Sequence, residues 1–283
     1  MTVAFFRQAD GSYLKQEISK PLNPDTKLPI ASLSKSMAAT LILDAIKDGR
    51  LKPEQMIKIY PESKDLRDSD FSTKGLRKEW TEIPVHAALT QLLKLSSNPM
   101  AMNFAITLAG SSEKFVELMN ARAKEWQMKN TNFMTEHGLP ISDNKEKRKL
   151  EYTTAGDMII MAQHMLAYID DLKTYTNAPL AYWEPPPPNP RNPKPKPDEN
   201  KAQLIAEGAI IKTATITQCE SLLTIHPEGN VIISDIQLCV RKYSRFRNAL
   251  TTLRRAFGEI MSAPIPNAIA APQSSPQGQP SPQ

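Results

Sequence analysis

Ser32 and Lys35 are the two residues whose types and spacing point most directly to covalent chemistry. They stand three residues apart where apolar residues begin to recur at helical spacing, so they share one face of the expected helix, one turn apart. An uncharged lysine amine can take the proton of a neighbouring serine hydroxyl and make it a nucleophile. Taken alone, a Ser-x-x-Lys pattern also fits a capped surface helix, so other motifs must decide between these interpretations.

Two further motifs carry polar side chains in apolar surroundings. Ser96-Ser97-Asn98 lies between two apolar segments, in a tight turn where a hydroxyl and an amide can face a common site. Ordinary helix capping is the alternative interpretation. Lys212-Thr213-Ala214 stands inside an apolar run typical of a strand, where the lysine needs a partner unless it is simply a charge on an edge strand.

The elements that must position these motifs are predicted from periodicity and turn residues. Strands are expected at 3–6 and 13–18 as a hairpin, and again at 205–218, 219–226 and 231–240. Helices are expected from about Ser32 to Asp48, and at 84–95, 99–109, 112–127, 153–169 (opened by Thr153 or Thr154) and 243–261. Strands at both ends of the chain enclose a helical middle. This order predicts an α+β fold in which an antiparallel sheet is formed from both chain ends.

The length and composition predict one folded domain with two atypical segments. With 283 residues the chain can bury one sizeable core, which we place at 1–261. Residues 184–198 are proline-rich and are expected to form an exposed insertion, and 262–283 are expected to be a disordered tail. The only cysteines, Cys219 and Cys239, fall on neighbouring predicted strands, and whether they pair depends on the register, which the sequence leaves open.

Charge and hydropathy exclude several classes of function. A net charge of +5 is spread along the chain without a dominant block, and no zinc-finger spacing or RNA-binding motif is present, so nucleic-acid binding is not expected. The first ten residues have neither a basic segment nor a seven-residue apolar stretch, so no signal peptide is expected. No run of eighteen apolar residues occurs, and no membrane segment is expected either.

In this order the three motifs resemble those of the low-molecular-mass penicillin-binding D-alanyl-D-alanine carboxypeptidases, which carry Ser-x-x-Lys, Ser-x-Asn and Lys-Thr-Gly. The resemblance runs from about residue 3 to 260. It includes further stretches in the same order, at 115–120, 130–133, 137–139, 152–158 and 244–247. The family implies a β-lactamase/transpeptidase-like fold, and it implies no metal or organic cofactor.

The resemblance also implies a role for each candidate residue. Ser32 would attack the carbonyl between two terminal D-alanines of a peptidoglycan stem peptide and form an acyl-enzyme. Lys35 would be the general base, its uncharged form favoured by burial and by the second cation, while Ser96 would relay the proton to the departing D-alanine. Among the substrate-binding residues, Asn98 would hold the substrate amide, Lys212 and Thr213 the terminal carboxylate, and the backbone N–H groups of Ser32 and Thr215 the oxyanion.

The family implies a cell-envelope location and β-lactams as inhibitors. A monomeric protein is expected. Two features depart from the family pattern. Ala214 stands in place of the glycine of Lys-Thr-Gly, where a methyl group can crowd the pocket. The family pattern also leads us to expect a leader and often a second domain, which this sequence does not show, so either the sequence is trimmed or export needs no leader. One alternative function is a catalytically silent domain that binds wall peptides or a protein partner, favoured by Ala214 and the proline-rich segment. The other is a β-lactamase of the same fold. The second is disfavoured because no glutamate stands in that enzyme's Glu-x-x-Leu-Asn context.

Overall fold

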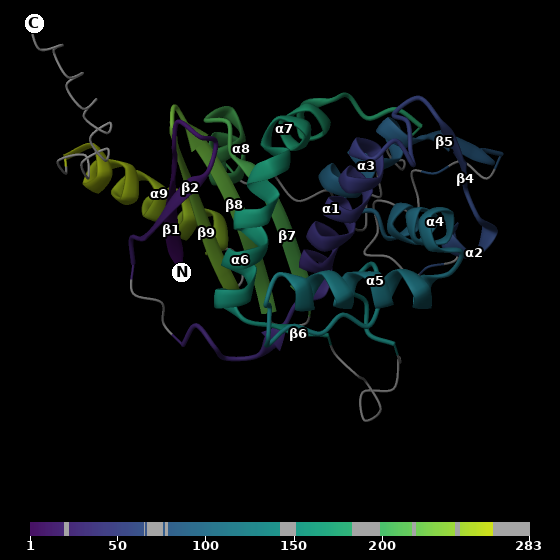
Figure 1. Ribbon diagram of the computed structural model, residues 1–283, viewed down its shortest axis with the longest axis horizontal. Helices are drawn as coiled ribbons and strands as arrows, with labels where there is room; N and C mark the ends of the chain where they lie inside the picture. Colours follow the sequence, from purple (N-terminus) through teal and green to yellow (C-terminus); the bar gives the residue numbers. More distant parts are fainter. Residues whose placement is uncertain are drawn as a thin grey trace, which may run out of the picture.

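The computed structural model describes residues 1–19, 23–64, 66, 76, 79–141, 151–182, 199–216, 219–240 and 244–262. Its largest sheet has five antiparallel strands in the order β2-β1-β9-β8-β7 (Figure 1). The N-terminal end supplies β1 (Thr2–Arg7) and β2 (Tyr13–Glu17), and the C-terminal end supplies β7 (Ile210–Ile216), β8 (Cys219–Glu228) and β9 (Val231–Val240). The prediction of an α+β fold with a sheet built from both chain ends is confirmed.

Helices occupy the middle of the chain and flank the sheet. Their bounds are η1 Ala31–Leu33, α1 Ser34–Lys47, α2 Pro61–Lys64, α3 Val85–Lys94, α4 Asn98–Ala109, α5 Ser112–Glu125, α6 Ala155–Met165, η2 Leu166–Tyr168, α7 Ile169–Asn177, α8 Glu199–Ala206 and α9 Arg245–Ser262. Two short ladders join distant segments: β3 (Leu28–Pro29) with β6 (Tyr152–Thr153), and β4 (Met56–Lys58) with β5 (Glu82–Pro84).

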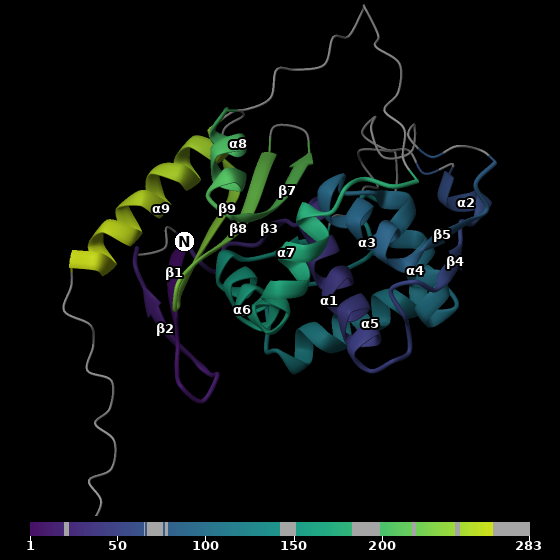
Figure 2. The same cartoon turned by 90° about the horizontal axis from the view of Figure 1, so that it is seen from above.

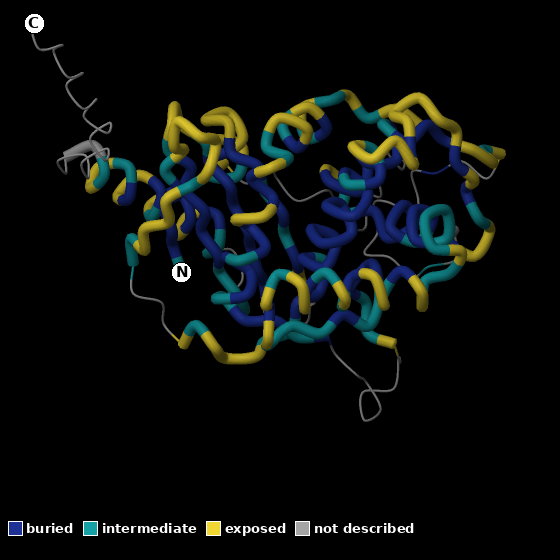
Figure 3. Tube along the Cα trace, viewed as in Figure 1, coloured by how far each residue is buried: buried dark blue, intermediate teal, exposed yellow. Residues whose placement is uncertain are grey.

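The sheet is covered on both faces, each by its own apolar cluster. Helix α9 crosses one face against β8, β9 and β1, with α8 beside it, while α6 lies on the opposite face (Figure 2). The cluster beneath α8 and α9 includes Leu204, Leu222, Phe246 and Leu253. The larger cluster on the other face gathers the helices around α1, which is buried over most of its length (Figure 3). The apolar surface removed from water on both faces stabilises the sheet that carries the third motif.

Several predicted boundaries need correction. The expected strand at 205–218 is wrong in its first part, because α8 continues to Ala206 and β7 begins only at Ile210. The β-branched Ile205 suggested a strand, but its side chain is exposed on α8 while Leu204 next to it is buried against α9. The expected helix at 153–169 is instead α6, η2 and α7, which together extend to Asn177.

Other boundaries agree with the sequence or shift by a residue or two. The α-helix after the first motif begins at Ser34, with Ser32 in the 3₁₀ turn before it. Thr154 caps α6 by accepting a hydrogen bond from the backbone N–H of Asp157, as expected for one of the two threonines. In the β8–β9 hairpin, Pro227 still pairs with Ile232, so the turn contains only Gly229 and Asn230.

Some predictions fall outside the described part of the chain. These are the proline-rich insertion at 184–198 and the tail, which is described only as far as the end of α9. The pairing of Cys219 with Cys239 depends on the side chain of Cys219, which is also outside the described set. Among the helices that are described, none is both long and apolar enough to cross a membrane.

Candidate active site

The first motif forms a hydrogen-bonded pair at the start of α1. Ser32 is half-buried in the turn η1, and the amine of Lys35 donates a hydrogen bond of 3.0 Å to its Oγ. Lys35 is fully buried because the first turns of α1 are surrounded by the core on every side. The alternative of a capped surface helix is therefore wrong, because the amine lies in the interior of the fold and not in solvent.

The second and third motifs form another such pair. Lys212 lies on the edge strand β7, yet it is only 5% exposed, and its Nζ donates hydrogen bonds of 2.7 Å to Ser96 Oγ and 2.9 Å to Thr213 O. Ser96 stands in the turn between α3 and α4 at a φ of +58°, which is uncommon for a non-glycine residue. Capping of α4 is performed by Ser97, which leaves the Ser96 hydroxyl to Lys212.

Strand β7 brings these two pairs together, because it packs against η1 and therefore against the turn that holds Ser32. Alternation along the strand directs Lys212 and Ala214 to its buried face. Thr213 is half-buried and Thr215 is exposed on the opposite face. Asn98 begins α4 and is buried two residues after Ser96. All seven candidate residues thus lie on η1, α1, β7, the α3–α4 turn or the first residue of α4.

Further cations surround Lys212. Burial depresses the pKa of Lys212 well below its ordinary value, and the charges of Lys35, Lys201 and Arg245 lower it further. Arg245, the first residue of α9, donates hydrogen bonds of 2.9 Å to Ala214 O and 3.0 Å to Thr215 Oγ1. Lys201 and Arg245 were not among the candidates predicted from the sequence. The stretch 244–247 resembles the family domain, but the sequence did not predict that Arg245 lies beside β7.

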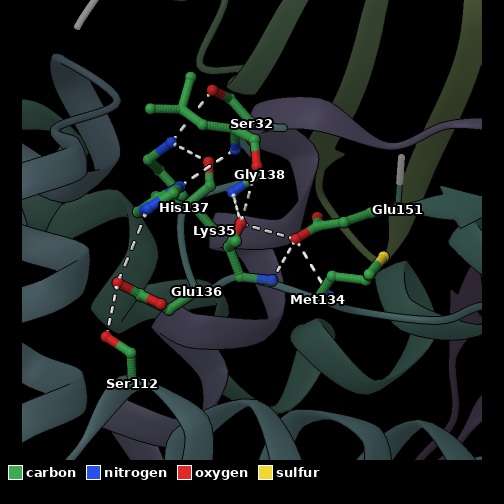
Figure 4. A network of polar contacts seen from close by, with 10 residues as sticks. Ser32, Lys35, Ser112, Met134, Glu136, His137, Gly138 and Glu151 are labelled. Carbon is green, nitrogen blue, oxygen red and sulfur yellow. Dashed lines mark hydrogen bonds and ion pairs between the residues drawn. The ribbon is translucent and has the colours of Figure 1, made fainter. Parts of the chain in front are cut away.

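A turn at 134–138 closes over the other side of Lys35 (Figure 4). The carbonyl oxygen of His137 accepts a hydrogen bond of 2.5 Å from Lys35 Nζ. Burial and the charge of Lys35 lower the pKa of His137 to about 3, so its imidazole is neutral near pH 7. The backbone N–H of Leu139 donates to His137 Nδ1, which places the imidazole proton on Nε2, and this Nε2 lies 3.9 Å from Glu136 Oε1. The stretch 137–139 resembles the family domain, but the sequence predicted no role for this turn.

Two buried carboxyl groups lie beside the same turn. Glu136 accepts a hydrogen bond of 3.1 Å from Ser112, and burial raises its pKa. Glu151 is 4% exposed, and burial raises its pKa to about 7 against the opposing effect of its hydrogen bonds and of Lys35. Neither glutamate belongs to a motif that the sequence analysis singled out.

The chain was compared with known proteins. It is 30% identical over 165 residues to the D-alanyl-D-alanine carboxypeptidase DacA of Haemophilus influenzae, a match that covers 58% of this chain and 40% of that protein. The D-alanyl-D-alanine carboxypeptidase DacD of Francisella tularensis has a similar fold, with a TM-score of 0.68 at 19% identity over 90% of this chain and 69% of that one. The ampicillin-bound penicillin-binding protein D2 of Listeria monocytogenes gives a TM-score of 0.64 at 19% identity, over 90% and 96% of the two chains.

The family model described as D-alanyl-D-alanine carboxypeptidase matches residues 16–184, more than half of the chain. This match includes the Ser32 and Ser96 motifs and ends before Lys212. With that match, the chain belongs to the D-alanyl-D-alanine carboxypeptidase family of serine peptidases (S11).

Proposed function

We propose that this protein is a serine-type D-alanyl-D-alanine carboxypeptidase that acts through an acyl-enzyme. The observation that carries the proposal is the joining of two hydroxyl–amine pairs, Ser32 with Lys35 and Ser96 with Lys212, where β7 packs on η1. Both hydroxyls are half-buried and can meet a substrate, whereas both amines are buried. This is the arrangement that an activated nucleophile and a proton relay require.

The reaction has two steps. In the first, Ser32 Oγ attacks the carbonyl of the penultimate D-alanine while the uncharged amine of Lys35 takes the hydroxyl proton. The peptide C–N bond then breaks as Lys35 returns this proton through Ser96 to the nitrogen of the departing D-alanine, which leaves Lys35 uncharged again. In the second step, water attacks the ester on Ser32 while Lys35 takes a proton from the water and returns it to Ser32 Oγ, and the shortened peptide leaves with a new carboxyl group.

The substrate-binding roles follow the electrostatics of β7. Lys212 and Thr213 bind the terminal carboxylate of the peptide, and the nearby charges of Lys201 and Arg245 strengthen the attraction for an anion. An approaching carboxylate also favours the ammonium form of Lys212, which burial disfavours in the free protein. Asn98 holds the substrate amide, and the N–H groups of Ser32 and Thr215 receive the oxyanion.

The substrate class and the inhibitors are part of the proposal. The substrate is the stem peptide of peptidoglycan, which places the protein in the cell envelope, and the protein acts as a monomer. β-Lactams bind at Ser32, a role supported by the fold shared with the ampicillin-bound Listeria protein. The match spans less than half the length of the Haemophilus relative, so the activity of the whole relative is extended to this chain only as a proposal.

Release of free D-alanine tests the function directly. An N-acylated peptide ending in D-alanyl-D-alanine is incubated with the protein, and the same peptide ending in L-alanyl-L-alanine serves as a control. We expect D-alanine from the first peptide with wild type and none with Ser32→Ala. Binding of the peptide without release by folded wild type would favour the silent wall-binding domain instead.

A further inference from the structure

Glu151 joins the two segments that enclose Lys35. Its backbone carbonyl accepts a hydrogen bond of 3.3 Å from the N–H of Ile30, the residue that leads into η1. Its side chain points the other way, into the 134–138 turn (Figure 4), where Oε1 accepts hydrogen bonds from the backbone N–H of Met134 (3.1 Å) and from both the N–H and the hydroxyl of Thr135 (2.7 Å for the hydroxyl). One residue thus fixes both the entry to the nucleophile turn and the turn opposite it.

The turn that Glu151 holds is packed tightly against the nucleophile. Thr135 Oγ1 also accepts a hydrogen bond of 2.9 Å from the N–H of Gly138, which closes the turn on itself. Gly138 adopts a φ of +86°, and a Cβ atom placed on it would lie 2.0 Å from Ala31 O and 2.7 Å from Ser34 Oγ. With no free space on this side, a shift of the turn moves the His137 carbonyl relative to Lys35.

A carboxyl group at this position is costly for the fold. Glu151 is almost fully buried, and within the part of the chain that the structure describes its Oε2 atom has no hydrogen-bond partner. The hydrogen bonds from the 134–138 turn and the ammonium form of Lys35 oppose the effect of burial on the pKa of the Glu151 carboxyl. A buried polar atom without a partner destabilises a protein. The presence of a glutamate at position 151 is therefore better explained by a role in the site than by a contribution to the stability of the fold.

We propose that Glu151 is a positioning residue for acyl transfer, which holds the 134–138 turn so that the His137 carbonyl orients the Lys35 amine toward Ser32. The proposal rests on the function proposed above. It concerns the acceptor role of Oε1, which a glutamine reproduces and an alanine does not. It therefore separates the effect of the hydrogen bonds from the effect of the charge.

The test compares acylation by a fluorescent penicillin in wild type, Glu151→Gln and Glu151→Ala, with the folded fraction measured by circular dichroism. We expect the rate constant at saturating penicillin to fall by roughly 10- to 100-fold in Glu151→Ala, since misplacement of a catalytic group by about 1 Å has effects of this size. The penicillin concentration that gives half the maximal rate should stay within about 3-fold, and Glu151→Gln should keep a rate within about 3-fold of wild type. A structural defect alone would lower the labelled fraction and leave the rate constant unchanged.

Asp235→Asn is the matched control. Asp235 is another carboxyl with 2% exposure and a pKa raised by burial, but it bonds to Thr2 and Gln237 within the sheet. Its variant should lose stability and keep the acylation rate constant. If Glu151→Ala does not fold, Thr135→Val removes the hydroxyl that Glu151 accepts from and should slow acylation in the same way.

The outcomes separate this proposal from the proposed function. If wild type is not acylated at all, both fail. If wild type is acylated, an unchanged rate constant in folded Glu151→Ala (or in Thr135→Val where the alanine variant does not fold) overturns only the role of Glu151. The role of Glu151 is also overturned if the acylation rate constant of Glu151→Gln falls as far as that of Glu151→Ala, or if Asp235→Asn slows acylation equally.

Discussion

Ala214 is the residue at which the third motif differs from the Lys-Thr-Gly pattern that the family resemblance leads us to expect. It is 3% exposed on the same face of β7 as Lys212, and its carbonyl accepts the hydrogen bond of Arg245. Strand β7 packs against η1, and the methyl group of Ala214 stands at the position where the Lys-Thr-Gly pattern has no side chain. The volume of this methyl group therefore affects the space left for a substrate between Ser32 and β7.

The variant Ala214→Gly is expected to acylate faster with penicillin than wild type. One extra methyl group in a tightly packed site typically costs about 1–3 kcal/mol of strain. If its removal lowers the activation free energy of acylation by this amount, the rate rises roughly 5- to 150-fold. The fold itself should lose about 0.5–1 kcal/mol, because glycine weakens a strand. Timed gel labelling measures the rate. An equal or slower rate would show that the backbone has already adapted to alanine.

Lys212→Met should show that this residue is retained for activity at a cost in stability. Burial and neighbouring cations lower the pKa of Lys212 in the folded state, whereas in the unfolded chain it keeps its ordinary value of 10.5. At a pH between these two values, Lys212 is protonated in the unfolded chain and uncharged in the folded protein. Stability therefore rises as pH rises through this window, and below it the full penalty remains.

Removal of the amine should accordingly raise the thermal midpoint at pH 7 and flatten its dependence on alkaline pH. Acylation should fall by roughly 10- to 150-fold, because a hydrogen bond to a charged group is worth about 1.5–3 kcal/mol and the variant loses the amine that binds the carboxylate and donates to Ser96. Differential scanning calorimetry at several pH values and gel labelling measure the two effects. A lower midpoint together with unchanged acylation would contradict the account of Lys212.

Helices and strands were predicted best from the sequence where the spacing of apolar residues matches the face that the element buries in the fold. The apolar spacing after Ser32 predicted a buried helix, and the runs at both chain ends predicted the sheet, because burial of one face sets the period in each case. The prediction from sequence failed at Ile205, where a β-branched residue lies exposed on a helix. It also missed the 134–138 turn and Glu151, since their roles depend on contacts between residues far apart in the chain.

Gly138 gives the sharpest test of that turn. Gly138→Ala is expected to destabilise the protein much more than Gly49→Ala, although both glycines have positive φ angles, +86° and +74°. A Cβ on Gly49 meets nothing within 4 Å, so only the backbone cost of about 1–2 kcal/mol applies there. Urea unfolding of both variants isolates the collision with Ala31 O. Equal losses would show that the turn can move away from the nucleophile.

For the whole molecule, the fold brings four separate parts of the chain to one place. The nucleophile turn, the α3–α4 turn, the 134–138 turn and β7 each carry one part of the site, and the sheet and helices fix their relative positions. The seven candidate residues predicted from the sequence lie in these segments or in the adjoining first residues of α1 and α4. The central claim is that they act together on Ser32 as one acyl-transfer site.

Intact-mass spectrometry after incubation with benzylpenicillin tests this claim most directly. A β-lactam presents a strained amide in place of the D-alanyl-D-alanine bond, so attack by Ser32 opens the ring and retains the whole inhibitor as an ester. We predict one adduct on wild type, located at Ser32 by peptide mapping, and none on folded Ser32→Ala. Folded wild type without an adduct, or an adduct that persists in Ser32→Ala, would contradict the account.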